Sequence, residues 1–276
     1  MRCHRAGLAM LTGRAMGGFL AGILLVVPTS AGRAGDEVRL DWIAARLKAA
    51  YPAWIAGRKG LDLQWVDGFL QPIDDGRTGK SDAEAIASAD IKDMFRWTYP
   101  AGARLAAPVG AADPGRARND DFFKRMYGDC RTGGVERHLV TVIWLPKKAG
   151  QRLKVTKVNG VAGRLAEVSR ELDRLPAKFD RFLVPSAGTY NCRVIAGTRS
   201  PSAHSYGIAI DIAIKHSDYW RWARKGKSAA LSWRNSIPVE IVEIFERHGF
   251  IWGGRWHHFD TMHFEYRPEL IGVRGS

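Results

Sequence analysis

The chain has 276 residues, of which 46% are apolar and 25% are charged. This composition suits one large globular domain, or one domain with a smaller appendage, and it excludes disorder and collagen-like or coiled-coil fibres. Lys and Arg number 42 against 28 Asp and Glu, for a formal net charge of +14. No uninterrupted apolar run reaches 20 residues, which excludes a protein with several membrane spans.

Residues 1–34 have the layout of a secretory signal peptide. Arginines precede a 13-residue apolar run over residues 15–27, and small residues follow it. We predict export to the periplasm or the extracellular space, with cleavage near Ala31 or Ala34 and no stable membrane span afterwards. A single membrane anchor is the alternative, but the run is short and holds three glycines. Residues 1–34 contain four arginines and no acid, so their removal would leave a charge of +10.

The positive charge has three candidate partners: nucleic acid, an anionic membrane and an anionic cell-wall polymer. No run of five Lys or Arg occurs, and basic residues are scattered among acids. An exported protein also rarely meets nucleic acid. We therefore expect no nucleic-acid partner and a weak attraction to an acidic wall.

Two cysteines follow the signal, Cys130 and Cys192. In an oxidising compartment they predict one disulfide that closes a loop of about 60 residues. Two buried free thiols are the alternative. A metal site using both is disfavoured because no C-x-x-C pair is present.

The first half of the chain shows few regular elements. Apolar residues recur at helical spacing over residues 37–50, and Pro52 ends the pattern. Residues 57–82 are rich in Gly and Asp and predict turns, and residues 90–97 suit a short helix. Residues 100–120 are mostly Ala, Gly, Pro and Arg, which predicts a linker or a surface loop.

The second half is more regular, and its elements fall in a simple order. We predict a buried strand over 139–145, an alternating strand over 153–158, a turn at Asn159-Gly160, a helix over 165–175, short strands at 182–184 and 192–195, and a helix that Ser236 caps and Gly249 ends. Strands and helices mix without a regular βαβ rhythm, so the predicted fold class is α+β.

The first of two chemically informative segments is SPSAHSYGIAIDIAI, residues 200–214. Four isoleucines share one face of a predicted strand, and Asp211 lies between two alanines on the other face. A buried carboxylate there needs a cation or hydrogen-bond partners. His204 lies in the loop that leads into the strand, and Gly207 allows that loop to turn back, so His204 and Asp211 can meet.

The second segment is FIWGGRWHHFDTMHFEY, residues 250–266. His263 shares a predicted strand face with Glu265, and Asp260 lies in the turn before the strand. Two histidines and one aspartate form a three-ligand zinc set with a position open for water, and a further carboxylate can act as general base. Each piece alone also suits an ordinary loop, a carboxylate held by backbone N–H groups, or a turn.

Together the segments resemble the LAS-type zinc peptidases of bacterial walls and phage endolysins. These are the D-alanyl-D-alanine carboxypeptidases, the D-alanyl-D-alanine dipeptidases and the L-alanyl-D-glutamate endopeptidases. Residues 202–211 are similar to S-x-H-x-x-G-x-A-x-D, and residues 253–264 are similar to the W-G-G-x-W and D-x-x-H-F end of the endopeptidase-like branch. The resemblance covers residues 180–270, about a third of the chain.

The resemblance implies a LAS/hedgehog-like core, in which a small antiparallel sheet with flanking helices carries a Zn²⁺ site. It implies His204, Asp211 and His263 as zinc ligands and Asp260 as the catalytic carboxylate. The dipeptidases have Glu at that last position, so Asp favours a carboxypeptidase or an endopeptidase.

The family also places an arginine ahead of the first ligand, where it stabilises the developing oxyanion. Arg193 is the first choice here and Arg199 the second. We further expect Ser202, Tyr206 and Trp256 to contact a peptide substrate, with core packing as the alternative for the two aromatic residues. For Glu265, His257 and His258 the sequence leaves two roles open. Each side chain either forms a hydrogen bond that orients a metal ligand or lies exposed at the surface.

The predicted organisation is therefore a signal peptide (1–34), a helical and loop-rich extension of unknown role (35–120), and a zinc peptidase domain (121–276). The predicted function is an exported metallopeptidase that hydrolyses peptidoglycan stem peptides, as a D,D-carboxypeptidase or an L,D-endopeptidase. The alternative is a non-catalytic, zinc-stabilised cell-wall-binding module of the same fold. Asp260 argues against the module, because a structural zinc site needs no additional carboxylate.

Overall fold

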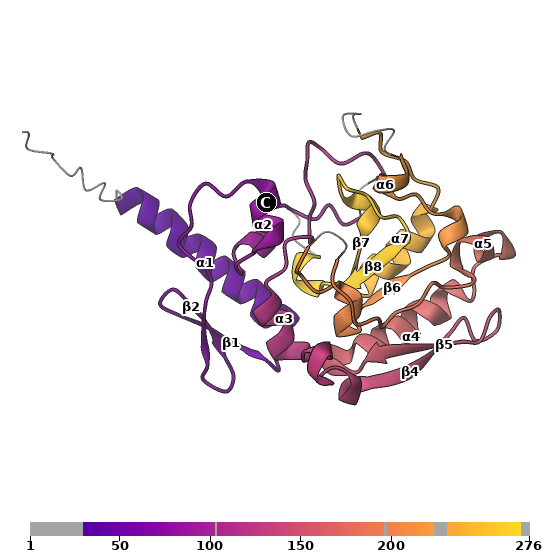
Figure 1. Cartoon of the computed structure of the whole chain (residues 1–276), viewed down its shortest axis with the longest axis horizontal. Helices are drawn as coiled ribbons and strands as arrows, with labels where there is room; N and C mark the ends of the chain where they lie inside the picture. Colours follow the sequence, from indigo (N-terminus) through magenta and orange to yellow (C-terminus); the bar gives the residue numbers. More distant parts are fainter. Residues whose placement is uncertain (1–29, 103, 196–197, 224–230, 272–276) are drawn as a thin grey trace, which may run out of the picture.

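The computed structural model describes residues 30–102, 104–195, 198–223 and 231–271 (Figure 1). Most of the predicted signal peptide, residues 1–29, lies outside these ranges. Helices and small antiparallel sheets make up the fold, which confirms the α+β class. Among the described helices, none combines the length and apolar character that a membrane span requires.

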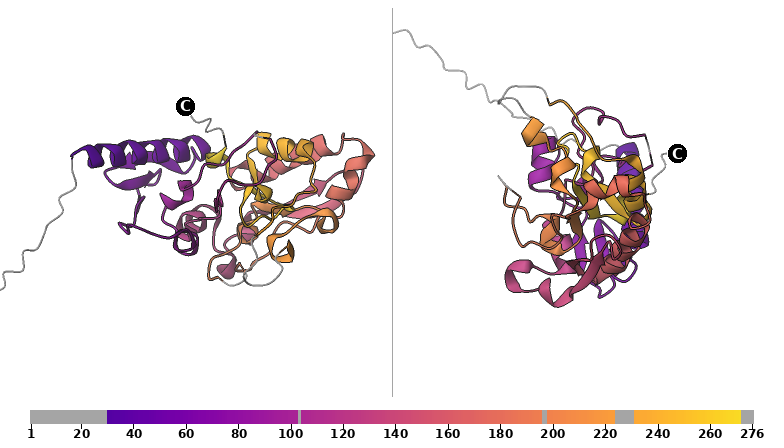
Figure 2. Two further views of the ribbon diagram at one scale, coloured as in Figure 1. Left: turned by 90° about the horizontal axis from the view of Figure 1, so that it is seen from above. Right: turned by 90° about the vertical axis from the view of Figure 1, so that its right-hand side faces the viewer.

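The N-terminal part consists of one long helix on a small sheet. Helix α1 (Ser30–Ala50) packs against the antiparallel strands β1 (Ile55–Lys59), β2 (Asp62–Trp65) and β3 (Leu70–Pro72), which lie in the order β1-β2-β3. The apolar residues of its helical pattern are buried, as predicted: Leu40, Ile43, Ala44 and Leu47. In Figure 2 this helix extends to one end of an elongated molecule.

The prediction of turns over residues 57–82 was wrong for residues 57–72, which form this sheet. The strands have only three to five residues each. Glycines with positive φ, Gly60 and Gly68, close the connections between them. Leu63 and Trp65 are buried while Gln64 between them is less so, which gives β2 the two-residue period of a half-buried strand. The frequent glycines around β2 made this short period hard to recognise in the sequence.

Residues 73–120 are less regular. Helix α2 (Asp82–Ala87) was not predicted, although Ser81 and Glu84 form a capping box at its start. A 3-10 turn, Asp93–Phe95, stands where a short helix was expected. The linker or surface-loop interpretation was wrong for residues 113–118, because most of them are buried against the C-terminal part. At Gly115 a Cβ would lie 2.4 Å from Ile251 Cδ1, so only glycine allows this close approach.

The C-terminal part holds two sheets and several helices. Its strands are β4 (Leu139–Trp144), β5 (Gln151–Thr156), β6 (Ala209–Asp211), β7 (Phe250–Trp252) and β8 (His263–Tyr266). Its helices are α3 (Asp120–Tyr127), α4 (Val161–Leu172), α5 (Asp180–Leu183), α6 (Trp220–Ala223) and α7 (Val239–Arg247). Further 3-10 turns are Cys130–Thr132, Glu136–His138, Val158–Gly160, Ala177–Phe179, Ala203–Tyr206, Ile214–His216, Gly253–Arg255 and Pro268–Leu270.

Strands β4 and β5 form a two-stranded hairpin, and β6, β8 and β7 form an antiparallel sheet with β8 in the middle. Helices α4 and α7 pack on each other and on these strands. Phe245 of α7 stacks on Phe264 of β8, with ring centroids 3.8 Å apart. The sheet that carries β8 lies inside the C-terminal part, beside α7 (Figure 1).

Four local predictions in this half were wrong. The strand predicted to be buried over residues 139–145 is only half buried, because Val140 and Ile143 are exposed. Residues 182–184 lie at the end of α5 and not in a strand, because two or three apolar residues fit either element. Residues 192–195 are irregular, apart from an isolated bridge between Val194 and Pro201. Ser236 does not cap α7: the cap position is Pro238, and the Ser236 hydroxyl donates to Asp218 instead.

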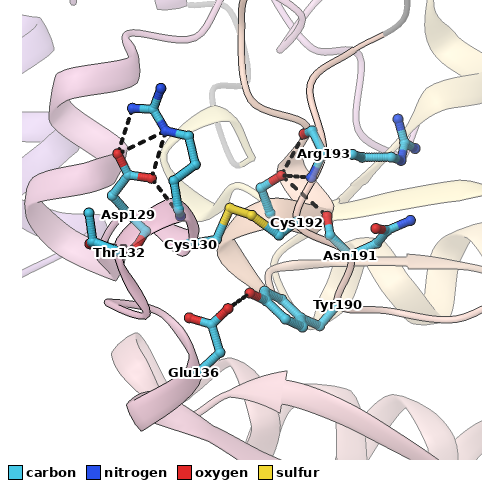
Figure 3. The surroundings of a disulfide bond; sticks show 10 residues. Asp129, Cys130, Thr132, Glu136, Tyr190, Asn191, Cys192 and Arg193 are labelled. Atoms are coloured by element: carbon cyan, nitrogen blue, oxygen red, sulfur yellow. Dashed lines mark hydrogen bonds and ion pairs between the residues drawn. A yellow bond between two sulfur atoms is a disulfide. The ribbon is translucent and has the colours of Figure 1, made fainter.

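The predicted disulfide between Cys130 and Cys192 is present (Figure 3). It joins the segment after α3 to the segment that leads into the 3-10 turn Ala203–Tyr206. Beside it, Arg131 donates to the Asp129 carboxylate, and Tyr190 donates to Glu136. The disulfide and the Tyr190–Glu136 hydrogen bond thus join the segment before the Ala203–Tyr206 turn to residues 130–136.

Candidate metal centre

The pairing of β6 with β8 brings Asp211 and His263 together. The strands are antiparallel, with Asp211 opposite His263 and Ala209 opposite Glu265. Residues directly opposite each other in an antiparallel pair project from the same face, as do residues two apart along a strand. Asp211, His263 and Glu265 therefore share one face of the central sheet.

His204 reaches the same face from the 3-10 turn Ala203–Tyr206. The Ser202 side chain caps the turn by accepting a hydrogen bond from the His204 N–H. Gly207 then reverses the chain into β6 with a φ of +67°. A Cβ at Gly207 would lie 2.9 Å from Leu139 Cδ2 and 3.1 Å from the Thr156 nitrogen, so a larger residue does not fit. The loop reversal expected from the sequence is therefore required by the packing.

The three predicted ligand side chains converge on one point. His263 Nδ1 lies 3.0 Å from Asp211 Oδ1, and His204 Nε2 lies 3.2 Å from both of these atoms. Two imidazole nitrogens and a carboxylate oxygen are ligands that zinc prefers. Bonds of about 2 Å in a tetrahedral site put neighbouring ligand atoms about 3.3 Å apart. The donor set and its spacing therefore fit a tetrahedral zinc ion.

Hydrogen bonds to the outer ring nitrogens orient both imidazoles. His204 Nδ1 donates to the carbonyl oxygen of Thr189, which can only accept. His263 Nε2 lies 3.1 Å from Glu265 Oε2. In the neutral rings the proton therefore lies on the outer nitrogen, and the inner lone pairs, on His204 Nε2 and His263 Nδ1, face Asp211.

Glu265 is itself buried and held by two arginines. Arg118 Nη1 donates to Oε2 and Arg267 Nη1 donates to Oε1, each at 3.1 Å. Burial alone would raise the pKa of Glu265, but Arg118 and the His263 ring hold it well below its usual range. The carboxylate is therefore ionised and available to the His263 ring.

The cluster attracts positive charge. Burial would lower the pKa of His263, but hydrogen bonds to Asp211 and Glu265 raise it to about 10. Burial would likewise raise the pKa of Asp211, and the two histidines hold it well below its usual range. In the metal-free protein a proton on the His263 ring supplies positive charge to the cluster. A bound divalent cation would supply positive charge in its place.

Asp260 lies in the turn before β8, as predicted. Its N–H donates to the Gly253 carbonyl oxygen at 3.0 Å. Its Oδ1 is buried and has no hydrogen-bond partner among the described residues. Burial raises the pKa of Asp260 to about 6, against the attraction of His263. A carboxylate with an unused oxygen beside a metal cluster is chemically suited to accept a proton.

Asp260 and His263 line a cavity of about 280 Å³. A larger hollow of about 390 Å³ lies beside α1 and residues 95–99, but its lining includes none of the cluster residues. We therefore identify the candidate site from the chemistry of the residues that line it and not from the volume of the cavity. The other residues that line the smaller cavity are Arg116, Arg118, Arg193, Ile195, Thr198, Ser202, Ala203, Tyr219, Trp220, Arg221 and Trp256.

The cavity lining includes three of the other predicted site residues, Arg193, Ser202 and Trp256. Arg199 is not part of the lining. Tyr206 is not part of it either: its ring is buried against Phe123 and Tyr127, in the packing role that was the alternative for this residue.

Three further residues of the segment 250–266 have defined contacts. Trp252 is a core residue whose Nε1 donates to the Thr261 carbonyl oxygen. His258 lies 2.6 Å from the buried carboxylate of Asp113, and the His257 N–H donates to the backbone. Neither histidine belongs to the three-residue cluster.

Sequence reasoning missed Arg116 and Arg118. Both lie in the run of residues 100–120 that was interpreted as a linker or surface loop. Two arginines spaced by one residue behind a Pro-Gly pair were the signal, and it was too weak to separate them from ordinary surface arginines. Their place beside the cluster depends on packing between distant segments.

Comparison with known proteins bears on the C-terminal part. Residues 196–266 match the family described as D-alanyl-D-alanine carboxypeptidase. The resemblance to zinc peptidases of the bacterial wall is confirmed. The peptidoglycan L-alanyl-D-glutamate endopeptidase CwlK of Bacillus subtilis (strain 168) is 39% identical over 72 residues, which are 24% of this chain and 40% of CwlK.

The chain thus spans about two fifths of the length of this curated relative. His204, Asp211, Asp260 and His263 all lie inside the family match, whereas Arg116 and Arg118 lie outside it.

Proposed function

We propose that this chain is an exported zinc metallopeptidase that hydrolyses peptide bonds in peptidoglycan stem peptides. The observation that carries the proposal is the convergence of three ligand atoms in a site that also holds Asp260, whose buried Oδ1 has no hydrogen-bond partner among the described residues. The family match and the similarity to CwlK, an endopeptidase by name, support a wall peptide as substrate. Both the D,D-carboxypeptidase and the L,D-endopeptidase type fit these findings.

In this proposal His204 Nε2, Asp211 Oδ1 and His263 Nδ1 hold the zinc ion. Zinc supplies Lewis acidity, which polarises the scissile carbonyl and makes water a stronger nucleophile at neutral pH. The protein keeps these three atoms close together before the metal binds, through the β6–β8 pairing and the hydrogen bonds to Thr189 and Glu265.

In this proposal Asp260 carries out the proton transfers. Its unpartnered Oδ1 accepts the proton of the attacking water and later returns it to the leaving amine. Arg193, which lines the cavity, adds positive charge where the carbonyl oxygen becomes negative. Ser202 and Trp256 line the same space and contact the peptide.

We further propose that residues 121–276 form the peptidase part and that residues 35–120 form an extension that supports it. Export, with cleavage near Ala31 or Ala34, would bring the chain to its substrate. A non-catalytic wall-binding module is the alternative function. Asp260 disfavours it, because a purely structural zinc site has no use for a buried carboxylate oxygen such as Asp260 Oδ1, which has no hydrogen-bond partner among the described residues.

The test combines metal analysis with product analysis. We expect about one zinc per chain and release of defined fragments from muropeptides, identified by mass spectrometry. Asp260→Asn should lower kcat by a factor of about 100 or more while zinc stays bound. Asp121→Asn, at an exposed acid on α3, is the matched control and should retain activity.

A chain that binds no zinc and leaves stem peptides intact would refute the proposal. Zinc binding without any turnover, unchanged by Asp260→Asn, would instead favour the binding module.

A further inference from the structure

Arg116 lines the cavity, and hydrogen bonds hold the residues just before it, 112–114, in place. The His257 N–H donates to the Ala112 carbonyl oxygen at 2.8 Å, and Trp256 Nε1 donates to that of Pro114 at 2.7 Å. The buried Asp113 accepts from the His258 N–H at 2.9 Å. The segment is therefore fixed to the loop that precedes Asp260.

This arrangement holds Arg116 at the cavity. Its Nη1 donates to the His258 carbonyl oxygen at 3.2 Å, and its guanidinium lies 5.6 Å from the centre of a Trp256 ring. Arg116 lines the same cavity as Asp260 and His263. The side chain is thus oriented on one side by a carbonyl and on another by an aromatic face.

The Arg116 guanidinium forms no salt bridge in the described part of the chain, although Asp113 and Asp260 lie near enough to raise its pKa against the effect of burial. Burial lowers the pKa of Arg116, since it removes water that would otherwise solvate the charge. A guanidinium has five N–H donors, and one carbonyl oxygen satisfies only a small part of them.

The cavity as a whole is positive. Four of its lining residues are arginines and one, Asp260, is a carboxylate. The charge of Arg118 is matched by Glu265. An anion that enters beside Asp260 would therefore meet Arg116 as a charged donor that forms no salt bridge with the described residues.

We propose that Arg116 binds a carboxylate of the peptide substrate, over the Trp256 ring and next to Asp260. This inference rests on the proposed function and adds a requirement for a negative charge on the peptide. A planar carboxylate matches the fork of a guanidinium and forms two parallel hydrogen bonds with it. The carboxylate comes either from the peptide C-terminus or from an acidic residue within the peptide.

Paired substrates separate the two sources. One pair has the same sequence with a free C-terminal carboxylate or a C-terminal amide. The other pair has an acidic residue or its side-chain amide inside the peptide. With the wild-type protein, we expect the carboxylate to lower KM by tenfold or more in one of the two pairs, and that pair identifies the source.

In Arg116→Gln this preference should disappear. The KM for the carboxylate peptide should rise to the KM for the amide peptide, and the KM for the amide peptide should stay close to its wild-type value. Arg116→Lys keeps the charge but not the fork, and should keep only part of the preference. Arg170→Gln, at an exposed arginine of α4, is the matched control and should behave as wild type. Bound zinc and the melting temperature report whether each variant folds.

An unchanged preference in folded Arg116→Gln would overturn the inference, as would a wild-type protein that treats both members of each pair alike. Failure of the proposed function would look different, because no peptide would be hydrolysed. In that case calorimetry of the same peptide pairs with the zinc-loaded protein decides the role of Arg116: loss of the carboxylate preference in Arg116→Gln supports it, and equal binding overturns it.

Discussion

Glu265 belongs to a buried row of side chains that starts at the metal cluster. His263, Glu265, Arg267 and Glu269 follow one another at two-residue intervals, and each contacts the next. Glu265 and Arg267 are fully buried. The sequence left Glu265 open between ligand support and a surface acid, and only the burial of β8 resolves its place. Its carboxylate orients the His263 ring and balances two arginines.

Glu265→Gln keeps the size of the side chain and removes its charge. We expect zinc affinity to fall about 10- to 100-fold, because His263 loses its charged hydrogen-bond partner. The free energy of unfolding should fall by about 3 kcal/mol, because Arg118 and Arg267 stay buried without this counter-charge. Chelator competition and denaturant unfolding measure the two effects.

Glu243→Gln, at an exposed acid of α7, is the control and should change neither quantity. Wild-type zinc affinity in folded Glu265→Gln would show that the carboxylate does not support the ligand.

At the scale of elements, the site depends on one turn and one strand pair. The 3-10 turn Ala203–Tyr206 ends at Gly207, where the chain reverses into β6, and β6 then pairs with β8. The disulfide fixes the segment that enters this turn. Since His204 lies within the turn, any distortion at Gly207 should move one ligand relative to the other two.

Gly207→Ala tests this dependence. The positive φ and the contacts that a Cβ would make predict a loss of about 1–3 kcal/mol in stability, together with weaker zinc binding. Gly163→Ala is the matched control, since Gly163 lies in α4 with no atom within 4 Å of the added Cβ. The control should stabilise the protein by up to about 1 kcal/mol. Equal zinc affinity in both variants would contradict the role of the turn.

The sequence predicted the cluster because its pieces are local. His204, Gly207 and Asp211 lie within eight residues, and a two-residue period shows which face Asp211 occupies. The small N-terminal sheet was missed because its strands have only three to five residues and glycines lie within β1 and in the turns between the strands. The placement of Arg116 beside Asp260 joins residues 144 positions apart, and no local pattern encodes such a contact.

At the scale of the whole molecule, the N-terminal part and the cluster belong to one packed structure. Tyr51, just after α1, donates to Glu269 at 2.6 Å, at the far end of the buried row. Arg46 of α1 donates to the carbonyl oxygens of Glu269 and Ile271. Arg118 reaches Glu265 from the segment before α3. These contacts cross the expected boundary at residue 120, so the extension supports the site through packing.

Tyr51→Phe tests the link between the two parts. Loss of the hydroxyl removes a donor from the fully buried Glu269 and should lower the free energy of unfolding by about 1–3 kcal/mol. Tyr206→Phe is the matched control, because the Tyr206 hydroxyl is buried with no hydrogen-bond partner among the described residues. Its removal should be neutral or slightly stabilising. A Tyr51→Phe variant as stable as the control would show that the link contributes little.

The burial along α1 has a consequence for maturation. Of the side chains described in this helix, residues 36–39 are exposed and Leu40 is the first that is buried. A signal peptidase that cuts at Ala31 or Ala34 would act on the first turns of α1. Both sites lie at least one helical turn before Leu40, the first buried side chain described in the helix. If the proposed cleavage occurs there, the remaining chain keeps Leu40 and every later side chain of α1 that packs on the rest of the protein.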